Sequence, residues 1–382
     1  MNSNERREAR YKRRVAFREK KRNAAVGQYD NFDAVFPFSN IFTSSQLCQR
    51  NIGWKKDVQA YKANRILNIF ETYNDLHEDK YRSSGFHEFT VVERGRERSV
   101  QSISMRDKVV QRCLCDFSLV PIISRSLIYD NGACLKKRGV SFAIKRMEHH
   151  LHKHFRKYGN EGYILQYDFS KYFDTLPHDK ANEIVDQFVR DEKLNKLTKY
   201  IISCFGDVGV GLGSYVAVVI ALAAANDIDH YMKEVMRVKC YGRYMDDGYI
   251  ISHDKEFLHR CLEALQAMCE KSGITLNTKK THITKLSRGF TFLKIRFCLQ
   301  KSGKVVKMVS RNNITRVRRR IKKFAKKVDE GKMNFLDAFN SIQSWLSYAK
   351  HSHSYRSRVS MVKLFNRLFE KHLIGGTRCL KY

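Results

Sequence analysis

The chain has 382 residues, 43% of them hydrophobic and 12% aromatic, so it can bury a large core and wholesale disorder is excluded. Its 72 Lys and Arg outnumber 39 Asp and Glu, and the formal net charge of +33 predicts a polyanionic partner, above all nucleic acid. The ten cysteines contain no C-x-x-C pair, so their spacing does not support a zinc site, and reduced thiols in a cytoplasm are expected.

The positive charge is concentrated in two arms, residues 1–22 and 301–382. The first arm has ten Lys and Arg against three acids, and the second has 21 against four. Together the arms carry 24 of the 33 net charges. A surface that served only for solubility would not need this clustering, so we expect both arms to hold nucleic acid.

Residues 5–22 are expected to form one charged helix. Because it lacks an apolar stripe, we expect it to lie on phosphate or against a partner, with Arg13 and Arg14 as nucleic-acid contacts. The chain starts without the apolar stretch of a signal peptide, and its longest apolar run, residues 215–225, is too short to cross a bilayer. These features predict a cytoplasmic protein with no membrane partner.

The patterning beyond this helix predicts a mixture of helices and strands. The expected helices span residues 61–76, 106–119, 141–158, 179–204, 215–234 and 254–272, and the chain from about 311 onward. The expected strands span residues 88–103 as two strands around Gly95, then 163–167, 240–244 and 248–252, and 288–298 as a pair. A Gly-rich segment over residues 206–214 precedes the helix that starts at Tyr215.

Two of the predicted strands lead into acidic residues. The apolar strand over residues 163–167 ends on Asp168, and Asp246 and Asp247 occupy the tight turn between two apolar strands. If Asp168 lies on the strand next to this hairpin, three carboxylates converge and repel one another unless divalent metal is bound. Such a set of oxygen ligands suits Mg²⁺, and two Mg²⁺ ions can activate a 3′-hydroxyl and stabilise a leaving pyrophosphate.

The strings YMDD at residues 244–247 and DFSKYF at residues 168–173 resemble the palm of a reverse transcriptase. The resemblance continues in the expected order through further segments at residues 93–98, 129–139, 211–214, 273–281 and 289–293. Among relatives, the chain is most similar to prokaryotic reverse transcriptases of the diversity-generating retroelement type and to related defence-associated enzymes, which act against phage.

The resemblance implies an α/β (α+β) right-hand polymerase. Fingers and palm, an antiparallel sheet with helices, would occupy residues 30–300. A helical, basic thumb would occupy residues 301–382, and residues 1–29 would be a basic helical extension. The implied activity is RNA-directed DNA polymerase, a nucleotidyltransferase that adds dNTPs to a 3′-hydroxyl.

The resemblance also assigns metal ligands. Asp168 and Asp246, with the backbone carbonyl of Phe169, would hold two Mg²⁺ ions, with Mn²⁺ as an alternative, and Asp247 would complete the acidic cluster. Phe173 occupies the family's steric-gate position, where an aromatic ring excludes a ribose 2′-hydroxyl; the alternative is that Phe173 is an ordinary core residue.

Other positions are expected to bind the nucleotide. Arg96 and Arg98 would neutralise the triphosphate, because a guanidinium makes bidentate contacts with phosphate, unless they are solvated strand charges. Lys280 would assist pyrophosphate departure; the alternative is a lysine on a surface helix. Gly213 belongs to the Gly-rich segment that precedes the template-contacting helix in the family.

The chain departs from the family after this glycine. Relatives usually have Gln-x-Ser-Gln, whereas this chain has YVAV at residues 215–218. One interpretation is drift compensated by packing. The other is altered templating, in which Tyr215 stacks on a base while hydrogen-bond readout by residues such as Ala217 and Val218 is lost.

The basic segment at residues 311–327 has nine Lys and Arg and no acid. Helical spacing predicts an apolar stripe of Ile314, Val317, Ile321 and Phe324 that packs on a core. The opposite face is expected to lie along phosphates through Arg318, Arg319, Lys322 and Lys323.

Several biological roles stay open at this stage. The favoured hypothesis is a bacterial or phage enzyme that uses a dedicated non-coding or structured RNA, in antiphage defence with atypical templating. Alternatives are a diversity-generating retroelement enzyme that copies a template repeat mutagenically, a catalytically idle RNA-binding scaffold, and an RNA-dependent RNA polymerase, which Phe173 and the YMDD string disfavour. The expected partners are RNA, a DNA product and dNTPs. The sequence leaves open whether the chain binds another protein or forms an oligomer, which RNA is the template, and whether the primer is RNA, DNA or protein.

Overall fold

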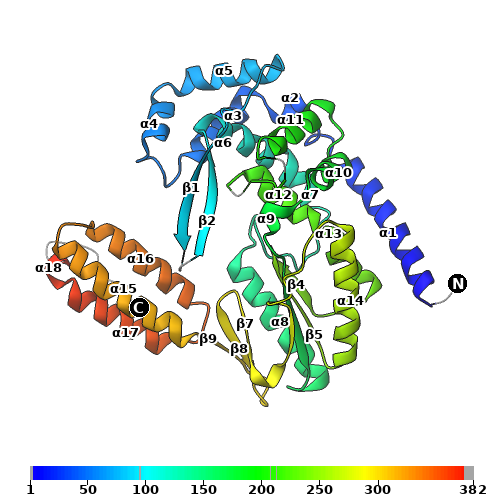
Figure 1. The fold of residues 1–382 in the computed structure, drawn as a ribbon, viewed down its shortest axis with the longest axis vertical. Helices are drawn as coiled ribbons and strands as arrows, with labels where there is room; N and C mark the ends of the chain where they lie inside the picture. Colours follow the sequence, from blue (N-terminus) through cyan, green and yellow to red (C-terminus); the bar gives the residue numbers. More distant parts are fainter. Residues whose placement is uncertain (1–2, 94–95, 207, 212, 374–382) are drawn as a thin grey trace. The chain divides into compact units, whose positions relative to one another are not determined.

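The computed structural model describes residues 3–93, 96–206, 208–211 and 213–373 (Figure 1). The chain divides into two compact units. One comprises Met1–Gly139, Gln166–Ile250 and His259–His282, and the other comprises Val140–Leu165, Ile251–Leu258 and Ile283–Tyr382.

The first unit is mostly helical. Its N-terminal half contains helices α1 (Ser3–Ala25), α2 (Phe32–Val35), α3 (Phe38–Cys48), α4 (Lys56–Ala63), α5 (Arg65–His77), α6 (Met105–Leu114), η1 (Cys115–Leu119) and α7 (Val120–Ile123). Its later helices are α9 (Tyr172–Thr175), α10 (His178–Phe188), α11 (Glu192–Ser203), α12 (Tyr215–Ala224), α13 (Asn226–His230) and η2 (Tyr231–Val235). The predicted strand pair around Gly95 is confirmed as an antiparallel hairpin of β1 (Phe86–Glu93) and β2 (Arg96–Ile103) (Figure 1).

A four-stranded sheet carries the acidic residues. Its strand order is β4 (Tyr241–Tyr244), β5 (Asp247–Ser252), β3 (Tyr163–Asp168) and β6 (His282–Lys285), and helix α14 (Lys255–Lys271) connects β5 to the segment before β6. The inner residues of β3 and β5 are buried in nearly continuous runs, as expected for strands covered on both faces. The predicted hairpin is confirmed, but its turn differs from the prediction: Met245 and Asp246 form the turn, and Asp247 is the first residue of β5, paired with Tyr244. Strand β3 is the neighbour of this hairpin in the sheet.

The second unit combines a helix, a small sheet and a helical bundle. It contains α8 (Val140–Tyr158), the sheet β7 (Phe290–Phe292), β8 (Ile295–Leu299) and β9 (Val305–Val309), and the helices η3 (Leu286–Arg288), α15 (Arg311–Asp329), α16 (Phe335–Ala349), α17 (Tyr355–Leu368) and α18 (Glu370–Leu373). Helix α15 contacts both α16 and α17. The predicted apolar stripe is confirmed: Val317 and Ile321 are buried in the bundle core, and Ile314 and Phe324 pack against it.

Polar side chains mark where several helices begin. The hydroxyl of Ser214 accepts a hydrogen bond from the Ala217 amide at the start of α12, and Ser310 accepts one from Asn313 at the start of α15. Each bond satisfies an amide that has no partner within the helix itself. The glycine-rich segment and the short linker after β9 therefore end at defined residues.

The structure differs from the predicted elements in a few places. The helix expected over residues 179–204 is two helices, because Val189 is extended and Asp191 caps α11. The helix expected over residues 61–76 is likewise split between α4 and α5. Strands β6 and β9 were not predicted; β9 pairs with β8 although its lysine and lack of strict alternation obscure the strand pattern. Within the described residues, no helix is both long and apolar enough to cross a membrane.

Candidate active site

The three aspartates come together at the hairpin turn. Asp168 ends β3 and is 4% exposed, and the amide of the next residue, Phe169, donates to the carbonyl oxygen of Asp246 at 3.2 Å. Burial, together with the neighbouring carboxylates of Asp246 and Asp168, raises the pKa of Asp247 to about 7. Three carboxylates therefore lie close enough to repel one another, as the sequence predicted.

The backbone of this turn is held by a buried arginine. Met245, which precedes Asp246, has a φ of 53°, a left-handed conformation that a side chain rarely adopts. The Arg243 guanidinium donates from Nη1 to the carbonyl oxygen of Met245 at 2.9 Å. The turn geometry is therefore tied to one side chain of β4.

That arginine is paired with Asp229 in the interior. Nη2 of Arg243 lies 2.7 Å from Oδ2 of Asp229, Nε lies 2.9 Å from Oδ1, and neither side chain is exposed. Tyr241 donates to the same carboxylate at 2.6 Å, and its hydroxyl lies 2.7 Å from that of Tyr167. Sequence reasoning missed this network. The available signal was one arginine inside an apolar strand, since a buried charge needs a partner.

Asp168 also has two polar neighbours. Its Oδ2 atom accepts from Nζ of Lys280 at 2.7 Å and from Nδ2 of Asn277 at 3.2 Å. Lys280 lies in a turn, so the alternative of a lysine on a surface helix is wrong. The lysine is half-exposed and brings a positive charge to the acidic cluster.

The acidic cluster fits a divalent cation in its chemistry. Carboxylate oxygens are the ligands that Mg²⁺ prefers, and a cation would relieve the repulsion that, after burial, contributes to the raised pKa of Asp247. The described side chains contain no group of three or more His, Cys, Asp or Glu already arranged around a metal position. Lys280 lies beside Asp168, at 2.7 Å, on the edge of this cluster.

Phe173 follows Asp168 by five residues and is only partly buried, whereas the preceding residue, Tyr172, is buried. Tyr172 is 5% exposed, and its hydroxyl donates to the carbonyl of Ala221 at 2.6 Å. The carbonyl of Phe173 accepts from Val210 in the Gly-rich segment at 2.9 Å. Tyr172 is thus the core residue of the pair, and the ring of Phe173 keeps access to solvent.

The Gly-rich segment passes directly against β2. Gly213 has a φ of 126°, and a Cβ atom there would lie 2.4 Å from the carbonyl oxygen of Gln101. Only glycine permits this approach. The next residue, Ser214, donates to Oε1 of Gln111 at 2.8 Å, which fixes the start of α12.

Tyr215 is half-buried beside Arg112. The guanidinium of Arg112 lies 5.6 Å from the centre of the tyrosine ring, and the backbone amide of Tyr215 donates to Gln111 at 3.1 Å. Burial raises the pKa of the Tyr215 hydroxyl. The side chain that replaces the usual glutamine is therefore already held by a cation, while Ala217 is buried in α12.

Arg96 and Arg98 lie on β2, where they pair in register with Glu93 and Val91. Their side chains lie outside the described part of the chain.

The predicted nucleic-acid contacts fall on two helices. Arg13 is exposed on α1, whereas Arg14 lies 3.8 Å from Glu234, which also pairs with Arg18. Helix α1 contacts η2, so it has a partner within the chain. On α15, the exposed cations include Arg318, Arg319, Lys322 and Lys323.

The chain matches a known protein family in sequence. A sequence model of a protein family, described as reverse transcriptase (RNA-dependent DNA polymerase), matches residues 58–297, which is more than half of the chain. The matched region includes all three aspartates, the Gly-rich segment and Lys280. A search of curated proteins found no match.

Proposed function

Because the chain belongs to the reverse transcriptase family, the RNA-directed DNA polymerases, we propose that Asp168, Asp246 and Asp247 are its catalytic carboxylates. The observation that supports this most strongly is the sheet order, which sets Asp168 on β3 beside the β4–β5 hairpin that carries the other two. The raised pKa of Asp247 supports the same grouping, since it requires nearby negative charge as well as burial.

Metal would be held at this cluster. Asp168 and Asp246, with the Phe169 carbonyl, would ligate two Mg²⁺ ions, or Mn²⁺, and Asp247 would complete the acidic environment. The ions would supply charge stabilisation for the attacking 3′-hydroxyl oxygen and the leaving pyrophosphate. Lys280, which contacts Asp168 at 2.7 Å, would move to the departing pyrophosphate as the cation at this edge of the site.

The nucleotide would lie beside β2 and the segment that leads into α12, which contact each other at Gly213. Arg96 and Arg98 on β2 would bind the triphosphate, Gly213 would allow the close backbone approach, and Phe173 would exclude a ribose 2′-hydroxyl. The partial exposure of Phe173 supports the gate, because a fully buried ring would have no access to the sugar.

The basic arms would hold the nucleic acid. On this proposal residues 1–29 form an extension that contributes Arg13 and Arg14, residues 30–300 form fingers and palm, and residues 301–382 form a thumb. The thumb contributes Arg318, Arg319, Lys322 and Lys323. Their exposure supports a phosphate-binding role.

For the biological role we favour a cytoplasmic bacterial or phage enzyme that copies a dedicated structured or non-coding RNA, in antiphage defence. The supporting observation concerns residues 215–218, where relatives usually have Gln-x-Ser-Gln. The guanidinium of Arg112 lies over the Tyr215 ring at this position, in place of amide side chains, which favours altered templating. Sequencing of the nucleic acid that co-purifies with the protein tests this. Faithful copying of an arbitrary RNA at ordinary efficiency would contradict it, and a product with a mutated repeat would favour a diversity-generating retroelement.

The experiment for the catalytic proposal is the double change Asp246→Asn and Asp247→Asn. DNA synthesis should be abolished while RNA binding is largely kept, since both changes preserve side-chain volume and remove only charge. Biological activity that survives this change would instead support the catalytically idle scaffold. A competition between dNTPs and NTPs separates DNA from RNA synthesis.

A further inference from the structure

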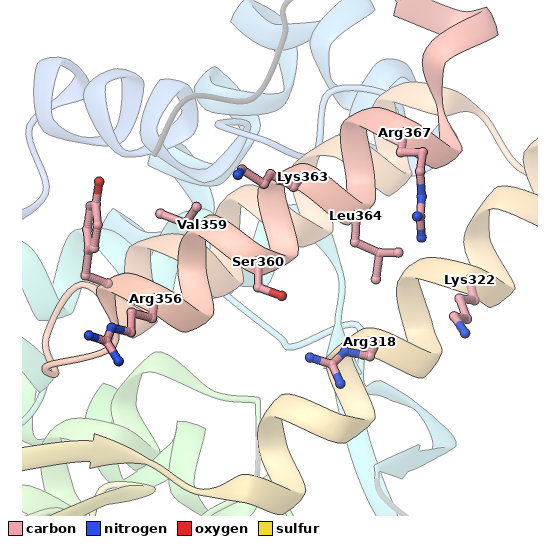
Figure 2. Close-up of a pocket in the computed structure, with 9 residues that line it drawn as sticks. Arg318, Lys322, Arg356, Val359, Ser360, Lys363, Leu364 and Arg367 are labelled. Atoms are coloured by element: carbon pink, nitrogen blue, oxygen red, sulfur yellow. The ribbon is translucent and has the colours of Figure 1, made fainter.

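A groove runs between α15 and α17 in the helical bundle of the second unit. It has a volume of about 610 Å³, and its lining includes five cations and a tyrosine: Arg318, Lys322, Arg356, Lys363, Arg367 and Tyr355. Figure 2 shows Arg318 and Lys322 on α15, facing Leu364 and Arg367 on α17. Cations from both helices thus border a floor that includes apolar side chains.

The five cations of the groove have no opposing charge. Within the described part of the chain, none of Arg318, Lys322, Arg356, Lys363 and Arg367 makes an ion pair or a hydrogen bond with another side chain, and all five are exposed. Two exposed cations outside the groove are paired, since Lys326 and Lys332 both lie near Glu330. Positive charge without a partner among the described residues therefore lines the groove, where an anionic ligand would be favoured.

The spacing of these residues follows the two helices. Arg356, Lys363 and Arg367 recur at intervals that place them along one face of α17, and Arg318 and Lys322 are one turn apart on α15. Two rows of cations match a ligand with regularly spaced negative charges. A phosphodiester strand has this character, whereas one isolated anion would use only part of it.

The width of the groove favours a single strand. Helices α15 and α17 pack directly on each other through the bundle core, and axes of packed helices lie about 8–10 Å apart. A duplex is wider than this, since its major groove alone is about 12 Å across. This close packing favours one sugar–phosphate strand, rather than a duplex, along the two rows of cations.

An exposed aromatic ring lies at one end of the groove. Tyr355, the first residue of α17, is 62% exposed, whereas Trp345 of the same bundle is buried. The centre of the Tyr355 ring lies 5.8 Å from the guanidinium of Arg358. Basic grooves that bind single strands combine phosphate contacts with aromatic rings on which bases stack, and Tyr355 provides such a ring.

We propose that the groove between α15 and α17 binds a segment of single-stranded RNA, with phosphates along the two rows of cations and one base stacked on Tyr355. Ser360 offers a hydroxyl within the groove that can hydrogen-bond to a ribose 2′-hydroxyl, the group that distinguishes RNA from DNA. The choice of RNA also rests on the proposed function, because the enzyme's template is RNA.

The test measures binding in the full chain that carries Asp246→Asn and Asp247→Asn, so that no synthesis occurs. The probe is a labelled single-stranded RNA of about 12 nucleotides, within the site sizes of known single-strand grooves. The triple variant Arg356→Gln, Lys363→Gln and Arg367→Gln is compared with the matched control Lys326→Gln, Lys332→Gln and Lys350→Gln, which removes as many charges from outside the groove.

The groove variant should weaken RNA binding by tenfold or more. It should also lower the magnitude of the slope of log affinity against log salt concentration by about 2, because each of the three lost contacts with a single strand accounts for about 0.7. The control should leave the slope nearly unchanged. Equal losses in both variants would overturn the proposal, because they would indicate general attraction rather than a site. All six positions are exposed, and thermal unfolding checks that the bundle stays folded.

Two further arms identify the ligand. Tyr355→Ala should weaken binding about 5-fold to 100-fold while Tyr355→Phe should not, because only the ring is needed for stacking. A groove variant that loses affinity for a blunt RNA duplex more than for the single strand would overturn the single-strand assignment. Equal binding of single-stranded DNA of the same sequence would overturn the assignment to RNA. None of these outcomes depends on DNA synthesis, so they are separable from failure of the catalytic proposal.

Discussion

Arg243 and Asp229 form a fully buried ion pair, and the same guanidinium donates to the carbonyl oxygen of Met245 in the β4–β5 turn. Burial by itself disfavours the charged arginine, but Asp229 outweighs this effect and raises the Arg243 pKa overall. The pair therefore links the protein interior behind the four-stranded sheet to the position of Asp246. A change in either residue is expected to act on the active site without touching substrate.

Arg243→Lys should lower kcat for DNA synthesis, by up to about 100-fold, with a smaller change in KM for dNTPs. A lysine keeps the positive charge but cannot bond Asp229 and the Met245 carbonyl at once, so the turn loses its anchor. Steady-state kinetics and thermal unfolding, measured together, check this. A variant with unchanged kcat would show that the turn holds its conformation without the arginine.

Asp229→Asn should destabilise the fold by about 3–5 kcal/mol, because it leaves a buried guanidinium without its counter-charge. Chemical denaturation measures the loss. The matched control is Asp186→Asn, since Asp186 is also paired with a cation, Lys199, but at an exposed site. A similar small loss for both variants would contradict the buried character of the Arg243–Asp229 pair.

Phe173→Ala should raise ribonucleotide incorporation by about tenfold or more, the order expected for one steric contact in a pocket. Loss of the ring removes the group that would clash with a 2′-hydroxyl. Incorporation of NTPs and dNTPs is measured in competition, with Phe173→Tyr as the variant that keeps the ring. Unchanged discrimination in the alanine variant would exclude the gate.

Gly213→Ala should impair folding or nucleotide binding, because its Cβ would lie 2.4 Å from the Gln101 carbonyl, a backbone atom that cannot turn away. A clash of this kind costs about 1–3 kcal/mol. Gly139→Ala is the control, since nothing lies within 4 Å of a Cβ at that position. If both variants unfold at the parent temperature and bind dNTPs equally, the Gly-rich segment does not need its contact with β2.

Arg13→Gln should lower the salt slope of RNA binding by about 0.7–0.9, the value for one lost phosphate contact. Arg18→Gln should not, because Arg18 is paired with Glu234 within the protein. Removal of residues 1–22 should lower the slope further. Affinities at about 50 and 200 mM salt make the comparison, and equal slopes for the two point variants would mean that α1 does not contact phosphate through its exposed face.

The local elements of the site were predictable from sequence because their signals are short-range. An apolar run that ends in Asp168, and two apolar strands that flank Asp246 and Asp247, need only neighbouring residues to define them. The exact turn was not predictable in this way, because the strand register places Asp247 in β5 and Met245 in the turn. The apolar stripe of α15 is equally local, since positions three and four apart share a helix face. Charge clustering likewise separated the basic arms from the rest of the chain.

The sequence by itself determined which residues are acidic, which segments form strands and helices, and that the chain resembles a polymerase. Only the tertiary structure decided that β3 pairs beside β5, that Arg243 finds Asp229, and that Lys280 reaches Asp168. The same holds for the groove, which is formed by residues of α15 and α17 that are separated in the sequence by helix α16. Such pairings depend on burial of distant side chains in one core, and no local pattern specifies which distant partner a buried charge or a helix face will find.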